Sequence, residues 1–304
     1  MPKPTLRTQY WVGALLVLTS AFCFAMKGIF IKLAYQYHID TISLLTLRML
    51  FSAPIYAVIA LQDGLRPTTK SFPVRQLWRI ATLGITGYYL ASFLNFEGLN
   101  YITANLERIL IFIYPTFVLL ISVIRYGRKI TKLQYAALAL TYLGIALAFV
   151  ENIDASQQKN IVLGAFWVIL SGLVYAFYLV GSGAVIPRVG PLRFTCFAML
   201  FATVPTVLHC AVANNLRIWH YPAEVYWISL AMAIGSTVIP TFMISEGVKR
   251  VGSSNASIIA SIGPIFTIFL ATSVLGETIS ALQVAGTVLV LIGVFLVGWK
   301  GEAI

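Results

Sequence analysis

Seven ionisable side chains fall inside long apolar segments of this sequence, where charge is expensive. They are Lys27, Lys32, Arg48, Glu97, Glu107, Arg108 and Glu246. An uncompensated charge in an apolar environment costs a great deal of free energy, so such residues by default mark a ligand or ion pathway. The chemistry they predict is the recognition of a small charged or polar solute.

Neutral polar residues add helical stripes to these charges. Tyr175 and Tyr178 share one stripe with Ser171 and Ser182, at steps of three and four residues that place side chains on one face of a helix. Tyr88, Ser92 and Asn95 follow the same rule. Because Ser also joins helices in lipid, packing is the alternative reading of each stripe. Tyrosine beside serine on two helices favours a wet cavity.

Motifs for catalysis, nucleotides or metals are missing from the sequence. There is no Gly-rich phosphate loop ending in Lys-Ser/Thr, no His-Glu-x-x-His and no pair of Asp-rich motifs for magnesium-diphosphate. His38, His209 and His220 form no ligand cluster, and Cys23, Cys196 and Cys210 lie at no metal-ligand spacing. We therefore expect no enzyme, no catalytic residue, no metal and no cofactor.

The composition indicates a membrane protein. Hydrophobic residues make up 59% of the 304-residue chain and charged residues 10%, whereas soluble domains are about 25% charged. A span needs about 20 apolar residues, and ten such runs occur, the first too long for a signal peptide. They are Tyr10–Ala34, Thr41–Leu61, Leu77–Gly98, Thr103–Ile124, Thr131–Val150, Ile161–Ile186, Pro191–Ala213, Pro222–Gly247, Ser253–Leu275 and Ser280–Trp299.

The net charge of +11 raises the alternative of nucleic-acid binding, but its distribution argues against it. With the amino terminus inside, the outer loops hold only Lys159 and Arg217. The inner side holds Lys3, Arg7, Arg66, Lys70, Arg75, Arg79, Arg125, Arg128, Lys129, Lys132, Arg188, Arg193, Lys249, Arg250 and Lys300. This positive-inside pattern predicts ten spans with both termini cytoplasmic, in the bacterial inner membrane.

The chain repeats itself at a constant offset of 149 residues, so that Glu97–Val150 matches Glu246–Trp299. Self-similarity of this kind indicates a chain built from two copies of one unit. We predict an all-α membrane protein with repeats at 1–150 and 151–304, which together form one transmembrane domain. Five helices per repeat is an odd number, so the copies are inverted around a central cavity.

The matched positions also suggest which residues move. Pro115 and Pro264 fall at equivalent points near the middle of the fourth and ninth spans, where proline commonly kinks a helix. Paired kinks at bilayer depth are typical of alternating-access carriers. We assign a hinge or gating role to Pro115, Pro264, Glu97 and Glu246. Small residues such as Gly144 and Gly293 in the fifth and tenth spans predict scaffold or dimer contacts.

The expected topology gathers the buried charges in the outer half of the first repeat, Glu246 excepted. Cations exceed carboxylates there by two, which favours an anionic substrate group. Pairing with neighbours is the alternative for Lys32 and Glu97, and Arg48 could equally be a structural ion-pair partner. The candidate substrate-binding residues are Lys27, Tyr88, Ser92, Glu107, Arg108, Tyr114, Tyr175 and Tyr178.

Several segments resemble the drug/metabolite transporter superfamily, specifically its EamA-type ten-helix carriers. They are Ile262-Gly263-Pro264, Leu275-Gly276-Glu277, Leu282-Gln283-Val284-Ala285-Gly286, Ile113-Tyr114-Pro115, Leu47-Arg48, Lys32 and Ile244-Ser245-Glu246-Gly247. The resemblance covers essentially the whole chain. It implies a basket of helices around a central cavity, with the fifth and tenth spans to one side. Arg128 departs from the pattern, since it stands where the second half has Glu277.

These observations lead to one functional hypothesis and two alternatives. We expect a secondary transporter that exports a small polar metabolite, such as an amino acid or organic acid, by alternating access. A channel or facilitative pore is the alternative, and an intramembrane enzyme is the weakest reading. The expected partners are the small-molecule substrate and the lipid bilayer, with proton or substrate counter-exchange, no nucleic acid, and a monomer or weak homodimer.

Overall fold

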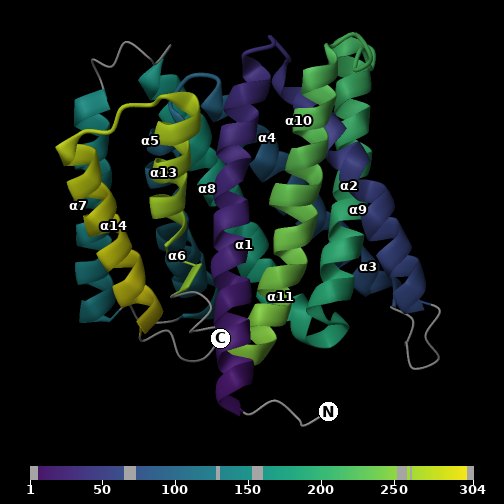
Figure 1. Cartoon of the computed structure of the whole chain (residues 1–304). Coiled ribbons are helices and arrows are strands. Elements are labelled where there is room, and N and C mark those ends of the chain that lie inside the picture. Colours follow the sequence, from purple (N-terminus) through teal and green to yellow (C-terminus); the bar gives the residue numbers. More distant parts are fainter. Residues whose placement is uncertain are drawn as a thin grey trace.

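The computed structural model describes residues 6–64, 73–127, 131–152, 160–251, 259–260 and 262–299, and all of their regular structure is helical (Figure 1). In chain order the helices are α1 (Leu6–Tyr35), α2 (Thr41–Gly64), α3 (Val74–Gly84), η1 (Ile85–Leu90), α4 (Ala91–Leu99), α5 (Ala104–Ile111), α6 (Tyr114–Tyr126), α7 (Lys132–Asn152), α8 (Ile161–Val189), α9 (Pro191–Asn214), α10 (Ala223–Ala233), η2 (Ile234–Val238), α11 (Ile239–Val251), α13 (Gly263–Leu275) and α14 (Ala281–Trp299).

The long apolar runs fold as helices because a backbone inside lipid must satisfy its hydrogen bonds internally. Within the described residues, six helical stretches are long and apolar enough to cross a bilayer: Gln9–Tyr35, Thr41–Gly64, Ala104–Arg125, Ile161–Val189, Pro191–Asn214 and Ala223–Gly247. Shorter apolar helices cover Gln134–Ala148, Gly263–Leu275 and Ala281–Gly293.

Several expected spans differ in detail from uniform α-helices, among them the eighth, which contains the π-helical segment η2 between α10 and α11. The third contains the π-helical segment η1 between α3 and α4, and the fourth is interrupted at Phe112 and Ile113 between α5 and α6. Pro115 and Pro264 therefore do not kink the middle of a helix. Each lies in the first turn of a new helix, α6 and α13, where the missing N–H costs nothing. Residues 253–258 and 261 of the expected ninth span, Ser253–Leu275, lie outside the described residues.

Local structure recurs at the offset seen in the sequence. Helices α6 and α13 are both 13 residues long, and they end at Gly127 and Gly276, with φ of 64° and 66°. Helices α7 and α14 each follow a reciprocal capping box, Thr131 with Gln134 and Ser280 with Gln283. The π-helical segments η1 and η2 also begin 149 residues apart, at Ile85 and Ile234.

The halves of the chain interlock through close glycine crossings. Helix α4 packs on α8 where Gly98 meets Gly164, and α11 packs on α1 where Gly247 meets Gly13. A Cβ on Gly98 would lie 3.0 Å from the carbonyl oxygen of Gly164, and one on Gly247 would lie 3.1 Å from that of Gly13. Glycine is therefore required for these helices to approach so closely.

Helices α7 and α14 form a separate pair at one side of the molecule, on the left of Figure 1. Gly144 and Gly286 face each other so closely that a Cβ on either would collide with the carbonyl oxygen of the other. Gly293 packs in the same way against Ala137 and Thr141. The small residues of these segments thus form an intramolecular scaffold contact.

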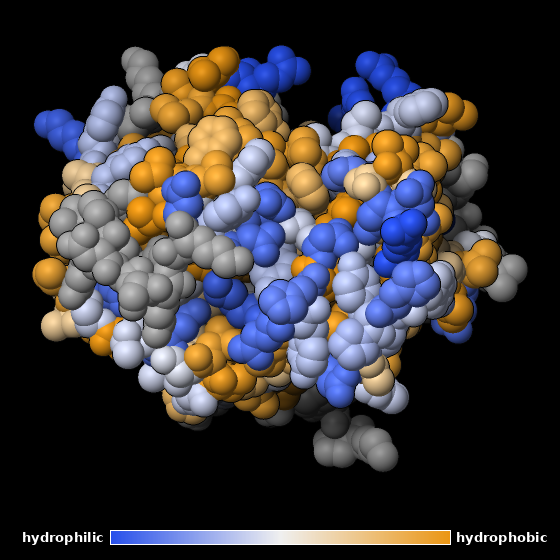
Figure 2. Space-filling model, turned by 90° about the horizontal axis from the view of Figure 1, so that it is seen from above, coloured by the Kyte–Doolittle hydropathy of each residue, from blue (hydrophilic) through white to orange (hydrophobic). Residues whose placement is uncertain are grey.

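The molecule has two distinct ends, which we call upper and lower as drawn in Figure 1. Helices α1 and α13 end at the upper end, while α1 begins and α11 and α14 end at the lower end. Basic residues cluster at helix termini of the lower end: Arg75, Arg125, Lys132, Arg188, Arg193 and Arg250. Seen from above, polar residues gather across the middle of the upper end and apolar residues surround them (Figure 2).

Candidate substrate-binding site

Four charged residues from three helices form a central charge cluster: Lys27 of α1, Arg48 of α2, and Glu107 and Arg108 of α5. Lys27 interacts electrostatically with each of the other three. A Cβ on Gly28, the next residue of α1, would lie 3.9 Å from Oε2 of Glu107, so α1 and α5 are closely packed here. Lys27 and Arg108 are each half-buried as whole residues, and the Nε of Arg108 is enclosed.

Glu107 is held in place by a neighbouring amide. Asn95 of α4 donates from Nδ2 to Oε1 of Glu107 at 2.6 Å, and both side chains are buried. Thr103 caps the start of α5 by accepting a hydrogen bond from the backbone N–H of Leu106. A single carboxylate, fixed by Asn95, therefore interacts with two cations of the cluster, Lys27 and Arg108.

Arg108 reaches across to the second half of the chain. Its guanidinium packs against Gly263, where a Cβ would collide with Nη2, and its Cζ lies 5.6 Å from the centre of the Phe112 ring. The first-half position that matches Gly263 is Tyr114. The two halves therefore differ at this position, and the guanidinium of Arg108 occupies the space that a side chain at Gly263 would enter.

Arg48 is the most enclosed cation, with 4% of its surface exposed. Its Cζ lies 5.0 Å from the centre of the Phe96 ring, and its Nε and Nη2 have no hydrogen-bond partner. Its electrostatic neighbours are the hydroxyls of Tyr56 and Tyr88 and the ammonium of Lys27. Among the described residues, Arg48 therefore has no carboxylate partner, and the expected alternative of a structural ion pair is wrong for this part of the chain.

Four tyrosines form a continuous aromatic wall beside the charges: Tyr88 of η1, Tyr114 of α6, and Tyr175 and Tyr178 of α8. Tyr175 lies 5.6 Å from Tyr114 and 5.5 Å from Tyr178, between ring centres, and Tyr178 lies 5.2 Å from Tyr88. The Tyr178 hydroxyl donates to the Tyr88 hydroxyl at 2.9 Å. Arg108 interacts electrostatically with Tyr114 and Tyr175, which connects this wall to the charge cluster.

The serines of the expected stripes have a different role. Ser171 donates to the carbonyl oxygen of Ala91 at 2.7 Å, joining α8 to α4, and Ser182 donates to the carbonyl oxygen of Leu179 within its own helix. Both are buried, so they contribute to packing, which was the alternative reading. Ser92 is half-buried on α4, one residue after Ala91.

The two glutamates expected to act as gates lie at opposite ends of the molecule. Glu97, near the end of α4, accepts hydrogen bonds from the Thr41 hydroxyl at 2.6 Å and the Tyr101 hydroxyl at 3.4 Å. Glu246, near the end of α11, pairs with Arg250 at 2.9 Å. Each glutamate directly precedes one of the crossing glycines, Gly98 and Gly247.

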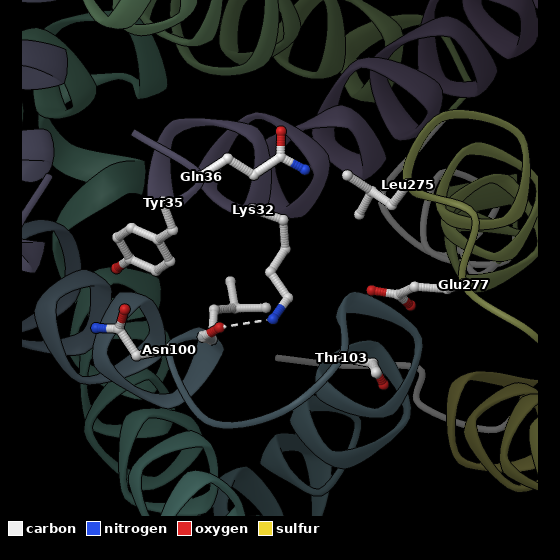
Figure 3. A pocket seen from close by; sticks show the side chains of 8 residues that line it. Lys32, Tyr35, Gln36, Asn100, Thr103, Leu275 and Glu277 are labelled. Carbon is white, nitrogen blue, oxygen red and sulfur yellow. Dashed lines mark hydrogen bonds between the residues drawn. The ribbon is translucent and has the colours of Figure 1, made fainter. Parts of the chain in front are cut away.

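A pocket of about 280 Å³ opens at the upper end, near the start of α5 (Figure 3). Its lining residues are Lys32, Tyr35, Gln36, Leu99, Asn100, Thr103, Leu275 and Glu277. Lys32 donates to the carbonyl oxygen of Leu99 at 3.0 Å, and Glu277 lies on the opposite side of the pocket from Tyr35.

The sequence did not point to Glu277 as a candidate site residue, although it belongs to the segment Leu275-Gly276-Glu277. Its carboxylate is 6% exposed and accepts hydrogen bonds from the backbone N–H groups of Ala104 and Asn105. Burial raises the pKa of this carboxyl, and the two hydrogen bonds and the nearby Lys32 counteract that only in part. The available signal was a charged residue directly after the glycine that ends α13.

Long apolar helices that surround buried and half-buried charged residues define an integral membrane protein of the transporter class. The chain matches the EamA-like transporter family over residues 11–150 and 162–299, and it belongs to that family. No group of three or more His, Cys, Asp or Glu residues within the described part could hold a metal ion.

Individual relatives are consistent with this family. The chain is 34% identical over 280 residues to the uncharacterized transporter YcbK of Bacillus subtilis, covering 90% of this chain and 88% of that protein. It is 25% identical over 319 residues to the uncharacterized transporter sll1319 of Synechocystis, covering 95% and 94%. A probable terminal-alkyne amino-acid exporter of Streptantibioticus cattleyicolor is 25% identical over 246 residues, covering 76% and 75%.

A solved crystal structure shares the architecture. It superposes with a TM-score of 0.65 at 16% identity, covering 96% of this chain and 98% of that chain. At this identity the likeness shows the fold alone.

Proposed function

We propose that this protein is a secondary transporter that exports a small polar metabolite, an amino acid or organic acid, across the bacterial inner membrane by alternating access. The observation that carries the proposal is the central charge cluster, which holds three cations and one carboxylate beside a wall of tyrosines. A membrane protein that only needed a packed interior would gain nothing from this unbalanced charge, because buried charge is costly.

The proposed topology is ten membrane passes as two inverted repeats, with both termini cytoplasmic. Matched helix ends at Gly127 and Gly276, and matched capping boxes before α7 and α14, support two copies of one unit. The basic helix termini of the lower end support a cytoplasmic placement of that end. The repeats correspond to residues 1–150 and 151–304, together one transmembrane domain.

Alternating access requires a barrier on each side of the site, and the glycine crossings supply candidates. Gly98 and Gly164 meet at the upper end, and Gly13 and Gly247 meet at the lower end. In our proposal the crossings separate in turn, with Glu97 and Glu246 beside them as gating residues. Pro115 and Pro264 begin the half-helices that move, since each follows a break in its span.

We further propose how the substrate is oriented. Lys27 and Arg108 receive its anionic end, because both are half-buried cations next to the single carboxylate Glu107. Tyr175 and Tyr178 flank its apolar body, with Tyr88, Tyr114 and Ser92 completing the site. The name of the amino-acid exporter relative agrees with a carboxylate-bearing substrate.

Purified protein in proteoliposomes tests transport and substrate orientation together. Unlabelled substrate inside the vesicles should accelerate uptake of labelled substrate, because only a carrier shows this trans-stimulation. Lys27→Met should weaken the binding of carboxylate substrates far more than the binding of the corresponding amides. Lys132→Met, at the exposed start of α7, should change the binding of neither. Flux without trans-stimulation would instead establish a channel.

Cysteine labelling tests the orientation. The cysteines Cys23, Cys196 and Cys210 are first replaced, and single cysteines are placed at Arg217 and Arg188, which are exposed at the upper and lower ends. An impermeant reagent added to intact cells should label Arg217→Cys and not Arg188→Cys. Labelling sites near Gln157 and Lys70 would serve equally, although both lie outside the described residues. The reverse pattern would refute cytoplasmic termini.

A further inference from the structure

Arg48 is a buried cation whose charge no described residue of the chain satisfies. Its Nε and Nη2 are enclosed and have no hydrogen-bond partner, and its described neighbours are neutral or positive. The Phe96 ring, 5.0 Å from Cζ, engages the guanidinium through its face. A face contact leaves the N–H groups at the guanidinium edge free, and those groups match a carboxylate in two-point geometry.

The charge balance of the cluster remains positive after the contacts among the described residues are counted. Within that part of the chain, Glu107 is the only carboxylate that interacts with Lys27, and its Oε1 is already occupied by Asn95. Guanidinium groups stay protonated in proteins, so Arg48 and Arg108 both keep their charge. One carboxylate cannot neutralise both guanidiniums and Lys27, so an excess of two cations remains among the described residues of the cluster.

The two guanidiniums occupy different surroundings. Arg108 contacts the Tyr114 and Tyr175 part of the tyrosine wall, whereas Arg48 interacts with Tyr88 and Tyr56. Lys27 interacts with both arginines. Each end of the wall therefore has its own arginine with an unpaired Nε, and the four tyrosine rings connect the two ends.

We infer that the substrate carries two carboxylates on an apolar linker, one bound at Arg108 and the other at Arg48, with Lys27 between them. This rests on the proposed function and narrows it from an anion in general to a dicarboxylate. It assigns to Arg48 a binding role in place of a structural one. The apolar linker lies along the tyrosine wall, which supplies ring faces.

The wild-type protein tests this without any substitution. The thermal stability of detergent-purified protein is measured against aliphatic and aromatic dicarboxylates of graded length and against the monoamide of each. Binding to the folded state raises the melting temperature. We expect one length of diacid to bind at least about tenfold more tightly than its monoamide, because two charge-assisted contacts replace one. Equal binding, or no stabilisation by any diacid, would overturn the dicarboxylate assignment.

Variants then locate the second carboxylate. Arg48→Met should reduce diacid affinity to that of the monoamide and leave monoamide binding unchanged. Arg48→Lys should retain part of the preference, since it keeps the charge without the planar edge. Arg79→Met, on the exposed face of α3, is the matched control and should bind like the wild type. Equal loss of both ligands in Arg48→Met, with normal thermal stability, would assign Arg48 to packing.

Transport of the panel separates this inference from the proposed function. Counterflow of monocarboxylates without a preference for diacids would support the proposal that the protein is a carrier and would refute the two-carboxylate site. Binding of a diacid without counterflow would support the two-carboxylate site and would refute the proposal that the protein is a carrier.

Discussion

The carboxylate of Glu277 accepts hydrogen bonds from the backbone N–H groups of Ala104, at 2.8 Å, and Asn105, at 3.0 Å. These N–H groups begin α5, and a helix N-terminus favours negative charge. Glu277 follows α13 in the second half of the chain, whereas α5 belongs to the first half and carries Glu107 and Arg108. This contact therefore connects the end of α13 directly to the helix that carries two members of the charge cluster.

We expect Glu277→Ala to destabilise the protein by roughly 1–3 kcal/mol, since it leaves two buried N–H groups unpaired. The counterflow rate should fall by a larger factor than the loss of stability alone would explain, because the start of α5 is then no longer held in position. Glu277→Gln, with one acceptor oxygen, should be intermediate. Melting temperature and counterflow are measured in parallel. Glu224→Ala, at an exposed position in the first turn of α10, is the control, and an equal effect there would contradict the coupling.

Substitution of the crossing glycines should bias access to the site. A Cβ on Gly98 would lie 2.6 Å from Val168, and one on Gly247 would lie 2.6 Å from Val17. Overpacking costs about 1–3 kcal/mol, so Gly98→Val should hold the upper crossing apart and Gly247→Val the lower one. A cysteine at Tyr175 should then react faster from the upper side in the first variant and from the lower side in the second.

The control for this experiment is Gly235→Ala. A Cβ there meets nothing within 4 Å, so the reactivity of the cysteine should not change. The gating proposal fails if Gly98→Val and Gly247→Val alter access from the same side.

The paired prolines should matter for transport more than for folding. Pro115 and Pro264 lie in first turns, where alanine is tolerated and no hydrogen bond is lost. With Pro115→Ala or Pro264→Ala, however, the break before each helix can close into a continuous helix. We expect normal expression and melting temperature with counterflow reduced severalfold. Unimpaired transport by both variants would remove the prolines from the gating mechanism.

Glu107 is the residue of the central charge cluster best placed to carry a proton. It is buried and receives a hydrogen bond from Asn95, and Gln would keep the shape without the charge. In proteoliposomes with an imposed pH gradient, Glu107→Gln should abolish the acceleration of transport by the gradient while counterflow continues. A full response in the variant would refute proton coupling through Glu107 and favour exchange or facilitated diffusion.

Asp40 links the first half of the chain to the second at the upper end. Burial raises the pKa of its carboxyl, but hydrogen bonds from Ser43, Tyr221 and Asn214 outweigh that effect and lower the pKa below 3.8. A lowered pKa means that the ionised form stabilises the fold. That stabilisation is fully present when the pH is above the pKa that Asp40 has in the unfolded chain. It is lost as the pH falls through the pKa that Asp40 has in the folded protein.

Asp40→Ala should therefore lower stability by about 1 kcal/mol near neutral pH, the usual cost of losing a helix cap. The difference from wild type should shrink at acidic pH. Melting temperatures between pH 3 and 7 provide the measurement. Asp40→Asn is the matched control. Its side chain can still cap α2, so this variant should lose less stability than Asp40→Ala. A constant difference across this range would show that the charge of Asp40 is not involved.

The sequence by itself determined the class of protein and much of the site. Apolar runs and the repeat indicated a helical transporter, and the structure shows long apolar helices with matched ends at Gly127 and Gly276. Periodicity placed Tyr175 and Tyr178 on one helix face. The structure brings them against Tyr114 and Tyr88 of other helices. Spacing along one helix suffices for such predictions, because it depends only on local geometry.

Only the tertiary structure decided which residues meet across the halves. Nothing in the neighbourhood of Glu277 along the chain indicates that it caps α5, 172 residues away. Likewise, Gly263 makes room for Arg108, and Arg48 has no carboxylate partner among the residues that the structure describes. These facts depend on how helices cross, and a helix crossing is set by the fit of two surfaces that the sequence of neither helix contains alone.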